Sequence, residues 1–116
     1  MPEEVNYNKK TGRIRIRAWG DDPIEDWIAS RDEVFRLRDV HGASKLLVDV
    51  REQVTTPSVS DIFQFGEDWP QDIRLAILMG EQTSEDVIFL ETVAINRAKQ
   101  VRVFYDEDDA LGWLKA

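Results

Sequence analysis

The first part of the chain alternates between polar and apolar side chains with a period of two. Between residues 13 and 19 arginines alternate with apolar positions, and the apolar positions include Ile14, Ile16 and Ala18. A period of two predicts a β-strand with one apolar and one charged face. Residues 5–7 form a shorter strand before it, and the polar segment between them ends at Gly12, as a turn does. This part of the chain therefore predicts a β-hairpin.

A helical period follows the hairpin. Asp22 and Pro23 are typical of a helix start, because Asp22 suits the cap and Pro23 suits the first helical position. Apolar side chains then recur at helical spacing, and Gly42 predicts that the helix ends near residue 41. Ser30 and Glu33 have the spacing of a second capping box, so a kink or restart near Ser30 is an alternative.

Three nearly continuous apolar runs predict buried strands. They are residues 45–50, 73–79 and 101–104. Strands without polar alternation are typical of a parallel sheet that helices cover on both faces. Residues 51–57 are polar and predict a connection after the first of these strands.

Capping residues mark three further helix starts after the predicted strands. They are Ser58, Thr83 or Ser84, and Asp106. Alternating strands and helices predict an α/β fold with right-handed crossovers. We expect a single domain over residues 1–116, with a mixed, mostly parallel sheet, an N-terminal β-hairpin and about four helices.

The composition limits what such a domain binds. The chain has 116 residues and a formal net charge of −8, which argues against sequence-independent binding to nucleic acid. It has no cysteine, so disulfides and thiol chemistry are excluded. No apolar run approaches the about 20 residues that cross a bilayer, and the acidic start does not resemble a signal peptide. We therefore expect a cytoplasmic protein with no transmembrane segment.

No catalytic constellation emerges from the sequence. His41 is the only histidine, and its place beside Gly42 suits a cationic residue at a helix C-terminus. A Ser-His-Asp triad would need a nucleophile elbow, which the sequence lacks. The scattered glycines form no phosphate loop, and without cysteine a transition-metal site is disfavoured. We therefore predict no enzyme activity, no cofactor and no metal.

The carboxyl ends of the predicted parallel strands form a natural crevice. Asp49, Arg51 and Tyr105 stand there. Carboxylates at such an edge are ligands for a hard cation such as magnesium, as in a response-regulator receiver. A receiver, however, has two strand–helix units before its aspartate and a lysine where this chain has Tyr105. The simpler interpretation is that Asp49 pairs with Arg51 or caps the backbone.

The chain resembles the STAS family, and more closely its SpoIIAA-like branch. The stretches that carry the resemblance are Leu46-Leu47-Val48-Asp49-Val50-Arg51, Phe89-Leu90-Glu91-Thr92-Val93-Ala94, and Val101-Arg102-Val103-Phe104 continued through Asp106 and Ala110 to Trp113-Leu114. The resemblance runs over nearly the whole chain. It implies a small regulatory or ligand-binding domain without enzymatic chemistry.

One motif of the founding members of that family is missing. Those proteins are phosphorylated on a serine in Asp-Ser-Ser/Thr-Gly, whereas residues 55–61 here contain neither an Asp-Ser pair nor a glycine. Ser58 stands at the corresponding place, and a helix cap explains the same residue type. The candidates for a phospho-switch or a partner surface are Thr56, Ser58, Val59, Ser60 and Ile62.

The resemblance also suggests a carrier or sensor of a small lipophilic molecule, held between helices and sheet. The candidate pocket residues are Trp27, Phe35, Phe63, Phe65 and Trp69. Ordinary core packing is the competing interpretation of such aromatics. A ligand predicts an internal cavity among these side chains. A partner predicts an exposed apolar patch around Val59, Ile62 and Phe63.

The leading hypothesis is a non-enzymatic module that binds a partner protein or a second copy of itself. The alternative is the carrier or sensor of a small apolar ligand. The stripe of Arg13, Arg15 and Arg17 is a further candidate surface, for an acidic partner or anionic lipid headgroups. A solvated face, paired with the chain's own acids, is the competing interpretation of that stripe.

Overall fold

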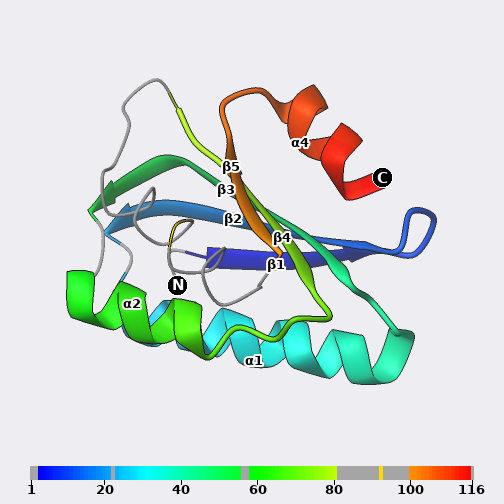
Figure 1. Ribbon diagram of the computed structural model, residues 1–116, viewed down its shortest axis with the longest axis horizontal. Helices are drawn as coiled ribbons and strands as arrows, with labels where there is room; N and C mark the ends of the chain where they lie inside the picture. The colour runs from blue at the N-terminus through cyan, green and yellow to red at the C-terminus, as the bar shows by residue number, and fades with distance from the viewer. Residues whose placement is uncertain (1–2, 22, 56–57, 81–91, 93–99, 116) are drawn as a thin grey trace.

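The protein is a twisted sheet with helices on both faces. The computed structural model describes residues 3–21, 23–55, 58–80, 92 and 100–115, and within these ranges leaves out the side chains of Thr55, Val59, Ile62 and Phe63. Figure 1 shows α1 and α2 along one face of the sheet and α4 on the other. The strands are β1 (Glu3–Asn8), β2 (Arg13–Asp21), β3 (Lys45–Thr55), β4 (Arg74–Leu78) and β5 (Val101–Phe104). The described helices are α1 (Ile24–His41), α2 (Val59–Glu67) and α4 (Glu107–Lys115).

The sheet confirms the predicted mixed topology. Its strand order is β1-β2-β3-β4-β5, with an antiparallel β1–β2 pair at one edge and parallel pairs elsewhere. The β1–β2 turn closes where the Gly12 backbone N–H donates to the Asn8 carbonyl at 2.8 Å. Gly12 has a φ of 69°, a left-handed conformation that glycine adopts without a Cβ clash.

Two cores lie on the two faces of the sheet. On the face that α1 and α2 cover, Ile14, Ile16 and Ala18 are all buried, as their alternation predicts. On the opposite face Ala110 and Leu114 of α4 pack against a smaller cluster from β3 and β4. The arginines of β2 stand on this second face, because successive side chains of a strand point to opposite sides.

Helix α1 runs without interruption from Ile24 to His41, so the alternative of a restart near Ser30 is wrong. Ser30 is buried, because it lies on the side of α1 that faces the sheet. The residue before the helix is Pro23, in an extended conformation, so Pro23 occupies the cap position and not the first helical position. At the other end Gly42 has a φ of 71° and donates its N–H to the Arg38 carbonyl, as predicted for a helix stop.

Strand β3 is longer than its apolar run predicts. Residues 51–55 continue the strand, where a polar connection was expected. They are held there because β2 is also long, and Trp19 and Gly20 lie beside Glu52 and Gln53 in the parallel register. Backbone pairing with a neighbouring strand therefore overrides the polar character of this segment.

The caps of two helices agree with the sequence. The Ser58 hydroxyl accepts the Asp61 N–H at 3.2 Å, and an Asp106 carboxylate oxygen accepts the Asp109 N–H at 3.1 Å. The helix expected from Thr83 or Ser84 lies outside the described residues, Thr92 excepted. Among the helices that the structure describes, none has both the length and the apolarity to cross a membrane.

Candidate functional site

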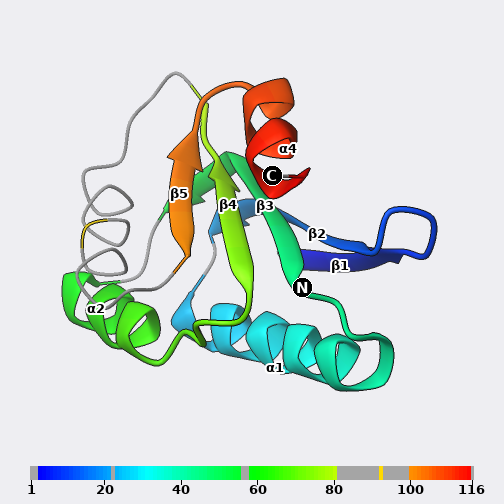
Figure 2. The same ribbon diagram turned by 45° about the vertical axis from the view of Figure 1, so that its right-hand side comes forward.

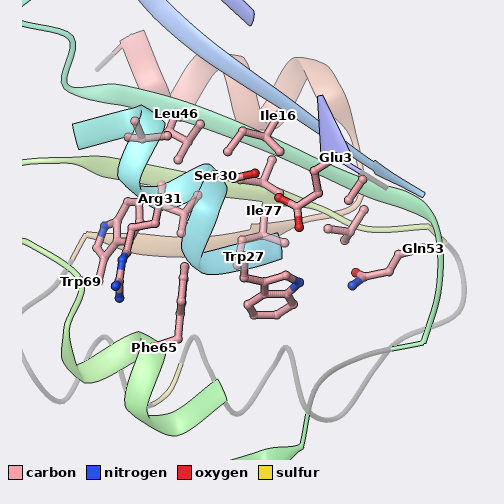
Figure 3. Close-up of a pocket in the computed structure, with 15 residues that line it drawn as sticks. Glu3, Ile16, Trp27, Ser30, Arg31, Leu46, Gln53, Phe65, Trp69 and Ile77 are labelled. Carbon is pink, nitrogen blue, oxygen red and sulfur yellow. The ribbon is translucent and has the colours of Figure 1, made fainter. Parts of the chain in front are cut away.

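A small cavity lies between the sheet and helices α1 and α2. Its volume is about 60 Å³. Figure 3 shows Trp27 of α1, Phe65 of α2 and Trp69 below the strands, which contribute side chains such as Ile16 and Leu46. The lining is almost entirely apolar, so water inside would find few hydrogen-bond partners.

Contacts among the rings of Trp27, Phe65 and Trp69 form the aromatic wall of the cavity, opposite the strands. The ring of Phe65 lies 5.3 Å from that of Trp27, edge to face, and 5.9 Å from that of Trp69. Trp69 is almost fully buried, and its indole N–H donates to the Ile73 carbonyl at 3.1 Å. A buried indole whose polar atom is satisfied gives a firm wall.

Three of the five predicted pocket residues line the cavity. They are Trp27, Phe65 and Trp69. Phe35 does not line the cavity. Its ring packs against the ring of Trp69, with 6.3 Å between the ring centres, and so lies one layer away from the cavity. The side chain of Phe63 lies outside the described residues.

Four polar side chains also line the cavity, namely Glu3, Arg31, Ser30 and Gln53, and of these the sequence pattern pointed only to Ser30, as a helix cap. Glu3 Oε2 and Arg31 Nε are buried and have no hydrogen-bond partner among the described residues. Ser30 is 6% exposed. In Figure 3 the Glu3 carboxylate reaches in from the sheet side toward Ser30. The alternation of the strand could have identified Glu3 as a lining residue, because Glu3 lies on the same face of β1 as Val5 and Tyr7.

An outer groove adjoins the cavity between α1 and α2. It has a volume of about 270 Å³ and includes Ile28 and Gln64. Arg31 and Phe65 line both the groove and the cavity. The Arg31 guanidinium lies 5.6 Å from the Phe65 ring centre, within cation–π range. These two side chains therefore separate the inner cavity from the groove.

The strand-end residues form a second cluster, on the face that α4 covers. Asp49 accepts hydrogen bonds from Arg51 Nε at 2.9 Å and Arg51 Nη2 at 2.7 Å. Arg15 adds a contact to Asp49 at 3.3 Å and another to Glu107 at 2.9 Å. Tyr105 is 56% exposed and has no hydrogen bond to this cluster, so the structure does not bring the three predicted crevice residues together.

The charge balance of this cluster keeps Asp49 ionised. Burial by itself raises the pKa of Asp49, but hydrogen bonds from the Arg51 side chain and backbone, with the charges of Arg51 and Arg15, outweigh it and lower the pKa. Among the described residues, no group of three His, Asp or Glu side chains is placed to hold a metal. The cluster is therefore an ion-pair network between strands and α4.

The candidate phospho-switch residues are only partly visible. Ser58 and Ser60 are exposed, and the Ser58 hydroxyl is engaged as the α2 cap. Thr56 and the side chains of Val59 and Ile62 lie outside the described residues. The structure accounts for Ser58 as a capping residue.

Comparisons with known proteins identify the fold. No family model matches the chain, and no curated protein is similar to it. Among solved structures, it is similar to an uncharacterized protein of the DUF3478 family with a SpoIIAA-like fold from Shewanella loihica PV-4. The two share 19% identity over 97% of this chain and 91% of the other, with a TM-score of 0.63. The chain therefore has the SpoIIAA-like fold that its strand order and residues predicted.

Proposed function

We propose that this protein is a non-enzymatic binding module that takes a small, largely apolar molecule into the cavity beneath α1 and α2. The observation that carries the proposal is the cavity itself, with Trp27, Phe65 and Trp69 on one side and aliphatic strand residues on the other. Ligand sites are typically concave and apolar, with a few polar groups that orient the ligand. Here Glu3 and Arg31 are such groups, because each has a buried atom without a partner among the described residues.

The size of the cavity restricts the ligand. A volume of about 60 Å³ is well below the ~150 Å³ of an engineered cavity that holds benzene. Without rearrangement the cavity accepts only a short branch or a chain end. A larger ligand enters if Phe65 and Arg31 swing aside, which joins the cavity to the outer groove.

The chemistry of the lining favours binding over catalysis. Ser30 is the only described lining residue with a hydroxyl. His41, the only histidine of the chain, stacks on Tyr7 at a ring distance of 4.6 Å and does not line the cavity. The Glu3 carboxylate is the nearest candidate base and reaches toward Ser30, but no hydrogen bond joins these two described side chains, so Ser30 is not activated as a nucleophile.

Binding of a partner protein, the leading hypothesis from the sequence, becomes the second candidate. It predicts an apolar patch on α2, and the side chains that would form the patch lie outside the described residues. The ligand hypothesis ranks first because its predicted cavity is present among the predicted aromatics.

Native mass spectrometry of the purified protein, followed by denaturing extraction, tests the proposal. We expect a co-purified lipophilic species in stoichiometric amount, or else a saturable change in tryptophan fluorescence when 1-hexanol is added. A clean apo mass combined with no fluorescence response to 1-hexanol contradicts the proposal and makes a partner pull-down the next step.

A matched pair of variants locates the binding site. Ser30→Leu adds an isobutyl group inside the cavity, whereas Ala29→Leu adds comparable bulk to the exposed side of α1. We expect Ser30→Leu to lose the bound species or the hexanol response and Ala29→Leu to retain it, because a filled cavity leaves no room. Equal binding by both variants excludes this cavity as the site.

A further inference from the structure

A second hollow lies on the other face of the sheet, at the hairpin. Its volume is about 690 Å³. Figures 1 and 2 show the β1–β2 hairpin running out beneath the last turn of α4, and Leu111 of α4 lines the hollow together with Leu47 of β3. The cations that line it are Lys9, Lys10, Arg13 and Arg15. No carboxylate is among the described residues of its lining.

Three of these four cations differ from Arg15 and from the next arginine of the same strand, Arg17. Arg15 pairs with Asp49 and Glu107, and Arg17 pairs with Glu52. By contrast, Lys9, Lys10 and Arg13 form no ion pair with any described residue, and Arg13 Nη1 is buried without a hydrogen-bond partner. The positive charges of Arg15 and Arg17 are therefore neutralised by acids, whereas those at the hairpin are not paired with any described residue.

The cluster of unpaired cations at the hairpin is informative because the chain as a whole is acidic. A net charge of −8 supplies acids that neutralise the arginines elsewhere, yet among the described residues of the lining only Arg15 is paired with a carboxylate. A concave site lined by charges of one sign raises the local concentration of counter-ions. Guanidinium and ammonium groups are the side chains that bind phosphate, and the two leucines offer an apolar surface beside them.

We infer that the hairpin hollow binds a small organic phosphate. The phosphate meets Lys9, Lys10 and the Arg13 guanidinium, and the organic part of the ligand contacts Leu47 and Leu111. The volume lies in the range of small-molecule sites, about 300–1,000 Å³. This site is separate from the cavity beneath α1, and it does not depend on the function proposed there.

Backbone amide NMR at low ionic strength, with inorganic pyrophosphate as the probe, tests this inference. We expect saturable shifts confined to residues 8–15 and the part of α4 around Leu111, weakening as salt is added, since salt screens exposed charges. Absence of saturable shifts, or shifts spread over the whole protein, overturns the inference. Co-sedimentation with phosphatidylcholine vesicles containing phosphatidylglycerol, without a pyrophosphate response, assigns the surface to a membrane and also overturns it.

Two variants and one control separate the hollow from a general charge effect. Lys9→Gln/Lys10→Gln changes only turn residues, and Arg13→Gln removes the unpartnered nitrogen. Each is expected to weaken pyrophosphate binding about tenfold, as the loss of close unit charges does in a partly desolvated site. Arg102→Gln removes one exposed charge from β5, at the opposite edge of the sheet, and is expected to change nothing.

The comparison between these variants decides the outcome. Weaker binding in the hairpin variants alone supports the site. Equal weakening by Arg102→Gln, or unchanged binding in the double lysine variant, contradicts it. The double variant guards against loss of fold in Arg13→Gln, because its two lysines are exposed in the turn.

Discussion

At the scale of single residues, Asp49 shows how a charged side chain is stabilised on a largely buried strand. Its carboxylate receives the Arg51 backbone N–H at 3.1 Å and two nitrogens of the Arg51 side chain. The side chains of Arg15 and Arg51, which both pair with Asp49, are 42% and 45% exposed, so water screens part of their attraction to the carboxylate. The network holds β2, β3 and the start of α4 together, and its contribution to stability is modest.

Asp49→Asn is expected to lower the free energy of unfolding by about 1 kcal/mol at neutral pH, because a charge-assisted contact becomes a neutral one. The folded pKa of Asp49 lies below its ordinary value, so the stabilisation is complete above the unfolded pKa and is lost as pH falls through the folded one. Urea unfolding should therefore show the gap between wild type and variant closing below about pH 4. Glu52→Gln, in the exposed pair with Arg17, is the control, and a pH-independent gap for Asp49→Asn contradicts this account.

At the scale of elements, α2 depends on its cap and on a few aromatic contacts. Its first turn is secured by the Ser58 hydroxyl, and its inner face contributes Phe65 to the cavity. A nine-residue helix is short for independent stability, so tertiary packing supplies most of it. The position of α2 therefore depends on the Ser58 cap at its start and on the aromatic contacts of Phe65 near its end.

Ser58→Ala is expected to lower the free energy of unfolding by about 1 kcal/mol, because the Asp61 N–H loses its acceptor. Ser58→Asp should restore most of that loss, since aspartate is also a good cap. Ser60→Ala is the matched control within the helix and should have little effect. Thermal unfolding of the three variants gives the comparison, and equal stability of Ser58→Ala and Ser60→Ala would show that the cap does not matter.

At the scale of the whole molecule, the cavity joins segments that are far apart in the chain. Glu3 reaches it from β1, Gln53 from β3 and Phe65 from α2. The Glu3 carboxylate oxygen, which has no hydrogen-bond partner among the described residues, carries a cost in the empty protein, because a buried polar group without a hydrogen bond is unfavourable. A bound ligand with a donor group would remove that cost.

Glu3→Leu is therefore expected to raise the free energy of unfolding of the empty protein by about 1 kcal/mol and to weaken binding of a ligand that carries a donor. Glu4→Leu is the adjacent control, on the opposite face of β1 and exposed, and should leave both quantities nearly unchanged. Chemical unfolding at pH 7 provides the measurement. If Glu3→Leu is no more stable than Glu4→Leu, the carboxylate oxygen of Glu3 is satisfied in solution and this account is wrong.

Features that depend on neighbouring residues were predictable from the sequence. Alternation identified the buried face of β2, Gly42 marked the end of α1, and the caps Ser58 and Asp106 marked helix starts. These signals are local, because caps and periodicity arise within a few residues of the chain. The strand–helix order then predicted the mostly parallel sheet.

Features that depend on distant residues were decided only by the tertiary structure. Arg15 contacts Glu107 across 92 positions of the chain, and β3 extends to Thr55 because β2 lies beside it. Three of the predicted aromatics meet at one cavity, but Phe35 does not line it and Glu3 does. The sequence by itself therefore determined the buried face of β2 and the helix ends that Gly42, Ser58 and Asp106 mark. The packing of the elements decided which side chains meet, because that depends on strand register and on the placement of helices across the sheet.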